Sequence, residues 1–160
     1  MKRNGLRYLK TREKRALAEY LARLREQFGD QVQHVILYGS KVRGDFHDES
    51  DIDLFVVFKK LDSALEDAVM RVTLDVDLKY NVLLSDFLVA HQRFERMARI
   101  QEPLYRDLIG EGVDLWKRTP KSLLASASKN PKTTSDGRAN SSREARIAKP
   151  SAARTMRSLR

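Results

Sequence analysis

The chain has 160 residues, enough for one compact domain, and 41% of them are hydrophobic, so a buried core is possible. No stretch approaches the roughly 18 to 20 apolar residues that span a membrane, and the first residues are charged, so neither a membrane helix nor a secretory signal is expected. There are no cysteines, which excludes disulfides and thiolate metal sites and agrees with a reducing cytoplasm.

The net charge of +9 is distributed unevenly along the chain. Residues 1–116 carry 19 Lys and Arg against 20 Asp and Glu, whereas residues 117–160 carry 12 against 2. The second segment has no aromatic residue, so it cannot bury enough apolar surface to offset the entropy lost on ordering. We therefore predict a near-neutral folded domain over residues 1–116 and a disordered basic tail over residues 117–160.

The first half of the domain alternates between helical and strand periodicity. Apolar residues at i, i+3 and i+4 across residues 12–28 predict an amphipathic helix, with Gly29 in the left-handed position that often follows a helix. The apolar, β-branched run 32–38 predicts a strand. Residues 40–44 are compatible with one short helical turn, and the strongly apolar residues 52–58 predict a buried strand.

The second half continues this alternation. Ser63 and Glu66 have the spacing of a capping box, which predicts a helix from Ala64 to about residue 79. The remaining predicted elements are a strand over 82–89, a helix over 92–109 that is interrupted near Pro103, and a short strand over 113–116. This order predicts an α/β (α+β) fold with a small mixed sheet flanked by helices.

Two short motifs at strand boundaries carry the chemistry. Gly39 permits a sharp turn with close ligand approach, and Ser40 stands where a helix begins, so its hydroxyl and free N–H groups suit an anion such as a triphosphate. Asp51 and Asp53 are two residues apart on a strand, so both carboxylates point to one face. Carboxylates beside a phosphate-binding turn are oxygen ligands suited to Mg²⁺. Each motif alone is common on protein surfaces, but their order favours a functional site.

The pattern Gly-Ser, then Arg-Gly, then Ser-Asp-x-Asp-Leu resembles the polymerase-β-like nucleotidyltransferase superfamily, and the compact chain looks like its minimal bacterial and archaeal members. The resemblance covers roughly residues 14–116. It implies a nucleotidyltransferase fold and transfer of a nucleotide monophosphate, usually AMP from ATP, to a hydroxyl of a protein or small molecule. Small members of this type often act as antitoxins that adenylylate a HEPN-type toxin, so such a protein is an expected partner.

Four residues match the family motif: Gly39 and Ser40, implied to hold the triphosphate, and Asp51 and Asp53, implied to bind Mg²⁺ and to serve in catalysis. Lys41 and Arg43 lie close enough in sequence to be phosphate contacts as well. The alternative for both is exposed charge on a helix.

Active members of the family usually have a third carboxylate on the strand after the long helix. Aligning residues 80–85 to that strand places Leu83 where the acid is expected. Asp86 is the nearest carboxylate downstream and is a candidate third metal ligand, but it has the opposite strand parity and faces away unless the strand is bulged. The third acid is therefore displaced to Asp86, supplied otherwise, or missing. If it is missing, nucleotide binding survives without efficient turnover, as in a degenerate antitoxin module that acts by binding its partner.

The basic tail is a separate candidate source of function. Twelve basic residues without an aromatic residue to stack on bases predict binding to nucleic-acid phosphates without sequence preference. The alternative is an extension that only adds solubility. The tail's charge gives no information about the substrate of the near-neutral domain.

Overall fold

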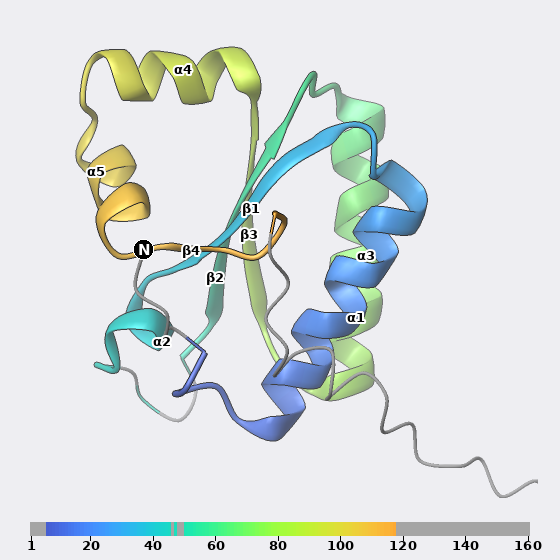
Figure 1. Ribbon diagram of the computed structural model, residues 1–160. Coiled ribbons are helices and arrows are strands. Elements are labelled where there is room, and N and C mark those ends of the chain that lie inside the picture. The colour runs from blue at the N-terminus through green and yellow to red at the C-terminus, as the bar shows by residue number, and fades with distance from the viewer. Residues whose placement is uncertain (1–5, 46, 48–49, 118–160) are drawn as a thin grey trace, which may run out of the picture. The chain divides into compact units, whose positions relative to one another are not determined.

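Four strands form a mixed sheet, which is described here from a computed structural model that covers residues 6–45, 47 and 50–117. The strands are β1 (Val32–Tyr38), β2 (Ile52–Phe58), β3 (Leu84–Ala90) and β4 (Val113–Asp114). Their order is β3-β2-β1-β4, with β1 antiparallel to both β2 and β4 and with β2 parallel to β3 (Figure 1). A parallel pair requires a crossover connection, which the long helix between β2 and β3 supplies.

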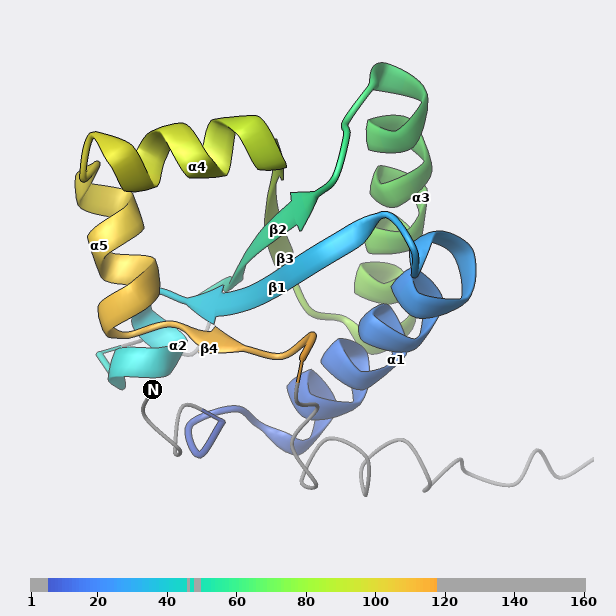
Figure 2. The ribbon, with the colours of Figure 1, turned by 45° about the horizontal axis from the view of Figure 1, so that its top comes forward.

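Helices cover the two faces of the sheet. On one face lie α1 (Thr11–Phe28) and α3 (Ser63–Tyr80), and on the other lie α4 (His91–Arg99) and α5 (Pro103–Gly110), as Figure 2 shows. The short helix α2 (Ser40–Arg43) follows β1 directly. The described helices include none long and apolar enough to cross a bilayer.

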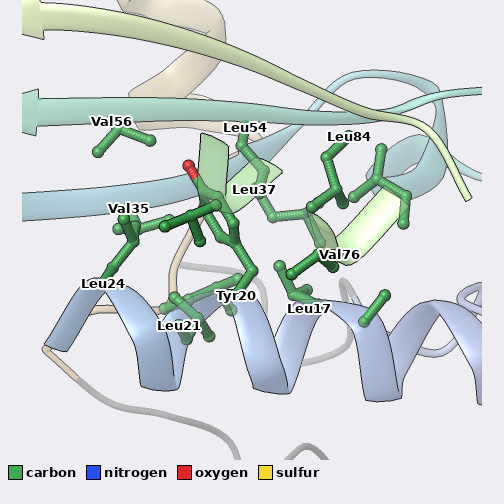
Figure 3. Packing of buried hydrophobic residues seen from close by; sticks show 14 of the residues in the cluster. Leu17, Tyr20, Leu21, Leu24, Val35, Leu37, Leu54, Val56, Val76 and Leu84 are labelled. Carbon is green, nitrogen blue, oxygen red and sulfur yellow. The ribbon is translucent and has the colours of Figure 1, made fainter. Parts of the chain in front are cut away.

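The larger core lies between the sheet and the helices α1 and α3. Tyr20 and Leu24 of α1 are completely buried and point toward the sheet, where Val35 of β1 and Leu54 and Val56 of β2 meet them (Figure 3). Strand side chains of the opposite parity, Ile36, Phe55, Val57 and Val89, form a smaller core with Met97 of α4 and Leu108 of α5. The central strands β1 and β2 are therefore buried on both faces, which explains their continuous apolar sequence.

Local signals set the ends of the helices. At the start of α1, the Glu13 carboxylate accepts a hydrogen bond from the Lys10 N–H at 2.8 Å. α3 is capped by Asp62, which accepts from the Leu65 N–H at 2.8 Å, and it ends at Asn81 in the left-handed conformation with φ 49°. Pro103 occupies the first turn of α5, where its missing N–H costs nothing.

The predicted mixed sheet flanked by helices is confirmed, and so is the interruption near Pro103. Several boundaries differ from the prediction. The cap of α3 is Asp62 rather than Ser63, because the helix begins one residue earlier than expected, and Gly29 adopts a right-handed conformation with φ −49°. β3 begins at Leu84 rather than residue 82, and β4 ends at Asp114.

Every described residue belongs to one compact unit. The predicted tail therefore lies outside the described residues, apart from Lys117.

Candidate active site

The candidate site is built on a sharp turn at the end of β1. The backbone of Gly39 has φ 77° and ψ −157°, a conformation that residues with a side chain rarely adopt. A β-carbon added to Gly39 would also collide with the carboxylate of Asp53. Glycine is therefore required here for two independent reasons, and the absence of its side chain lets the Asp53 carboxylate lie against the turn.

The turn continues directly into α2. The Gly39 carbonyl accepts hydrogen bonds from the N–H groups of Val42 at 3.1 Å and Arg43 at 3.3 Å. The helix closes at Gly44, whose N–H donates to the Ser40 carbonyl at 2.8 Å and whose φ is 90°. Ser40 thus occupies the first position of this short helix and is partly exposed, beside the strand that carries the two aspartates.

Asp51 and Asp53 stand at the start of β2. Asp53 pairs by its Cα with Tyr38 of β1 and with Ser85 of β3, so these three side chains form a row across one face of the sheet. Asp51 precedes Asp53 by two residues and shares its face. Both aspartates are partly exposed. They face the side of the sheet that carries α4 and α5, because Phe55, the next residue of this parity, belongs to the smaller core.

Electrostatics at this row favour a cation. Burial raises the pKa of Asp53, and the neighbouring charge of Asp51 raises it further, while Arg43 acts in the opposite direction. Burial also raises the pKa of the Tyr38 hydroxyl, with an added effect from Asp53. Arg43 is half exposed and is shared with Asp45 at 3.1 Å and Glu111 at 3.7 Å, so it compensates the aspartates only in part. Two oxygen-donor carboxylates whose repulsion is only partly compensated fit a divalent cation such as Mg²⁺.

The structure does not bring Lys41 to the exposed side of this site. Lys41 was expected as a phosphate contact, but its side chain is 0% exposed and its Nζ lies 3.0 Å from Glu13 Oε1 in the interior. A buried ammonium group needs a partner, and Glu13 supplies one for Lys41. Arg43, the other basic candidate, stays at the surface near Asp53.

Asp86 also lies away from the two aspartates. Its Oδ2 accepts hydrogen bonds from the Tyr20 hydroxyl at 3.0 Å and the Thr73 hydroxyl at 2.7 Å, on the face of the sheet covered by α1 and α3. The regular pairing of β3 with β2 contains no bulge that would turn the side chain round. Among the described residues, no group of three His, Cys, Asp or Glu side chains forms a metal cluster.

Leu83 occupies the place next to the aspartates. Its carbonyl accepts a hydrogen bond from the Ile52 N–H at 2.8 Å, which fixes it beside the residue between Asp51 and Asp53, and 57% of its side chain is exposed. An open depression of about 260 Å³ adjoins this point and is lined by Arg12, Glu13, Ser50, Ile52, Asn81, Val82 and Leu83.

Sequence reasoning missed three residues that shape the site: Tyr38, Ser85 and Glu13. Tyr38 and Ser85 flank Asp53 in the sheet, and the register that places them there depends on strand pairing between distant segments. Glu13 stands three residues after the cap residue Lys10, whose N–H it accepts, but lysine at the cap gives no capping-box pattern in the sequence. Nothing in the sequence indicated that it pairs with Lys41.

Two curated proteins of Methanocaldococcus jannaschii are similar to this chain. It is 28% identical over 104 residues to "Putative protein adenylyltransferase MJ0604", an alignment that covers 65% of this chain and 98% of that protein. It is 33% identical over 60 residues to "Putative protein adenylyltransferase MJ0141", covering 37% of this chain and 61% of that protein.

Solved toxin–antitoxin structures were also found. One contains AMP-PNP and has 20% sequence identity and a TM-score of 0.42, with 70% of this chain and 82% of that chain covered. A mutant of the toxin–antitoxin pair MntA–HpeT has 18% identity and a TM-score of 0.41, with the same shares covered.

The family model described as "Polymerase beta, Nucleotidyltransferase" matches residues 19–118. The match takes in more than half of the chain, including β1, the Gly39–Ser40 turn, Asp51 and Asp53. The resemblance inferred from the motifs is thereby confirmed, and the chain belongs to the polymerase β nucleotidyltransferase family.

Proposed function

We propose that this protein transfers AMP from ATP to a hydroxyl group of a protein acceptor in a Mg²⁺-dependent reaction. The observation that carries the proposal is the position of Asp53, two residues after Asp51, with its carboxylate against a turn at Gly39 that leaves no room for a side chain. Membership of the family supports nucleotidyl transfer. The names of the two similar archaeal proteins support AMP as the transferred group and a protein as the acceptor.

In the proposed reaction, the acceptor oxygen forms a bond to the α-phosphorus of ATP, the bond from that phosphorus to the pyrophosphate oxygen breaks, and the acceptor proton passes to solvent. Asp51 and Asp53 would hold Mg²⁺. When bound, this ion neutralises phosphate charge, lowers the pKa of the attacking hydroxyl and stabilises the leaving pyrophosphate. The backbone of Gly39 and the Ser40 hydroxyl would orient the phosphates, and Arg43 would contribute a further positive charge.

Transfer of radioactivity from α-labelled ATP to protein tests this proposal. We expect label to appear on an acceptor protein in the presence of Mg²⁺ and to disappear with Asp53→Asn, which keeps the size of the side chain but removes its charge. Asp67→Asn is the matched control, because Asp67 is an exposed aspartate near the start of α3, which follows the far end of β2. Equal labelling by wild type and Asp53→Asn would exclude the proposed catalytic role.

A second candidate function is a nucleotide-binding module that acts on its partner by binding alone. The position of Leu83, an apolar residue beside Asp51 and Asp53, favours it. In this case the partner, of the HEPN toxin type, would form a stoichiometric complex that survives Asp51→Ala and Asp53→Ala. Loss of the complex in these variants, together with label transfer by wild type, would favour the enzyme instead.

For both candidate functions we propose a cytoplasmic location, where ATP is available and a chain without cysteines is at no disadvantage.

Contact of the basic tail with nucleic acid remains a separate proposal, supported by the charge of residues 117–160. A chain ending at residue 117 should lose a steeply salt-dependent affinity for nucleic acid, since phosphate contacts release counterions. Equal binding by the shortened chain would exclude it.

A further inference from the structure

Lys41 is a buried charge directly beside the phosphate-binding turn. Its side chain is 0% exposed, and it follows Ser40 in the sequence. Lysine is almost never fully buried without a partner, because an ammonium group loses its hydration there. Its Nζ lies 3.0 Å from Oε1 of Glu13, whose own side chain is 5% exposed. The proposed nucleotidyl transfer assigns no role to this ion pair.

Glu13 is itself held in place by its position in α1. It is the third residue of the helix, and its Oε2 accepts the Lys10 N–H at 2.8 Å while Oε1 faces Lys41. One carboxylate thus serves two donors, one from the backbone at the start of α1 and one from α2. The pair therefore ties the turn after β1 to the beginning of a long helix that is anchored in the larger core.

A second contact joins the same two segments. The ring of Tyr8 packs against Gly44, so closely that a β-carbon on Gly44 would meet it. Figures 1 and 2 both show α2 near the segment that leads into α1. A helix of four residues has too few internal hydrogen bonds to hold its own conformation. Its position must therefore come from tertiary contacts, which include the burial of Val42 in the larger core and the Lys41–Glu13 pair next to Ser40.

We propose that Glu13 and Lys41 are positioning residues, whose ion pair holds the Gly39–Ser40 turn in the place where nucleotide phosphates bind. Neither side chain contacts the nucleotide. The proposal rests on the nucleotidyl-transfer function given above. Displacing a substrate-positioning group by on the order of 1 Å costs roughly 100-fold in rate. An ion pair that holds the turn in place therefore affects turnover without contacting the substrate.

The test uses Glu13→Gln in the full chain. A neutral amide offers one acceptor oxygen for the two donors Lys10 N–H and Lys41 Nζ. The link between α1 and α2 is therefore weakened, while the size of the side chain is kept. Amide hydrogen exchange of residues 39–44 without nucleotide should become about tenfold faster or more. The kcat/KM for label transfer should fall by about tenfold or more in protein whose circular dichroism is native.

Lys41→Met then separates positioning from direct contact. It leaves Glu13 buried without its ammonium partner, and Glu13→Gln added to it removes the unpaired charge. If the pair positions the turn, the double variant recovers part of the kcat/KM and of the slow exchange lost in Lys41→Met. If Lys41 instead contacts phosphate, Glu13→Gln alone leaves exchange and activity unchanged, which overturns the proposal.

Lys79→Met is the matched control, because Lys79 pairs with another glutamate of α1, Glu19, at 2.6 Å but is 53% exposed. It should leave exchange of residues 39–44 and kcat/KM unchanged.

If Lys41→Met does not fold, Glu13→Gln still decides the outcome. Unchanged exchange of residues 39–44 in Glu13→Gln overturns the positioning role even if wild type transfers label. Faster exchange of residues 39–44 in Glu13→Gln, together with a wild type that never binds ATP, would reject the proposed function while retaining the structural link between α1 and the turn.

Discussion

The Asp53 carboxylate lies where a side chain on Gly39 would have to be. Gly39→Ala therefore forces either the turn or the carboxylate to move, in addition to the strain of φ 77°. We expect this variant to lose about 1–3 kcal/mol of unfolding free energy and to bind Mg²⁺ and ATP much more weakly. Urea unfolding and calorimetric titration with ATP and Mg²⁺ measure the two effects.

Gly110→Ala is the control for this prediction. Gly110 ends α5, and a β-carbon there meets no atom within 4 Å. Alanine should leave nucleotide binding unchanged and stabilise the fold by roughly 0.5 kcal/mol, because it lowers the entropy of the unfolded chain. Wild-type stability and binding in Gly39→Ala would show that the contact with Asp53 is unimportant.

Removing the charge of Asp53 should stabilise the protein while abolishing metal binding. Burial and Asp51 raise the pKa of Asp53 in the folded state, so ionising it costs folding free energy. The folded protein holds this proton to higher pH than the unfolded chain does. The cost is therefore absent below the unfolded pKa of about 3.9 and grows until the pH passes the folded pKa.

Without Mg²⁺, Asp53→Asn should unfold at a higher temperature than wild type at pH 7. Its free energy of unfolding should be larger by an amount on the order of 1 kcal/mol or less, because the group is partly solvated. The difference should vanish near pH 3. Thermal unfolding across pH, with and without Mg²⁺, provides the measurement, and added Mg²⁺ should stabilise only wild type. Equal stabilisation of both proteins by Mg²⁺ would place the ion elsewhere.

The turn and the two aspartates were predictable because each depends on local sequence. Strand periodicity gave Asp51 and Asp53 a shared face, and it also predicted that Asp86 faces away from Leu83, which the regular register of β3 confirms. The destination of Lys41 was not predictable. Its partner Glu13 is 28 residues distant, and only tertiary packing decides whether a lysine on a short helix points outward or into the protein.

Asp86 should contribute to stability and not to metal binding. Asp86→Ala leaves the hydroxyls of Tyr20 and Thr73 without their shared acceptor in a buried region, at a cost of about 2–3 kcal/mol. Asp75→Ala is the control, because the ion pair of Asp75 with Arg23 is exposed and is worth about 0–1 kcal/mol. Urea unfolding and Mg²⁺ titration distinguish the two roles. A loss of Mg²⁺ affinity in Asp86→Ala at unchanged stability would show that Asp86 is a metal ligand.

Leu83→Asp should convert the two-carboxylate site into one with three. Leu83 is held beside Ile52 by a backbone hydrogen bond that the substitution keeps, and its side chain is already 57% exposed, so little core packing is lost. A third carboxylate next to Asp51 and Asp53 increases their repulsion in the absence of metal and offers a further oxygen ligand in its presence. We therefore expect a lower unfolding temperature without Mg²⁺, about tenfold tighter Mg²⁺ binding and faster label transfer.

Leu78→Asp is the control, because it adds the same charge at a leucine of α3 that is 83% exposed, and it should change none of these three quantities. If both variants bind Mg²⁺ equally well, the place beside Asp51 is not the position of a missing ligand, and the two aspartates act with a donor from another source.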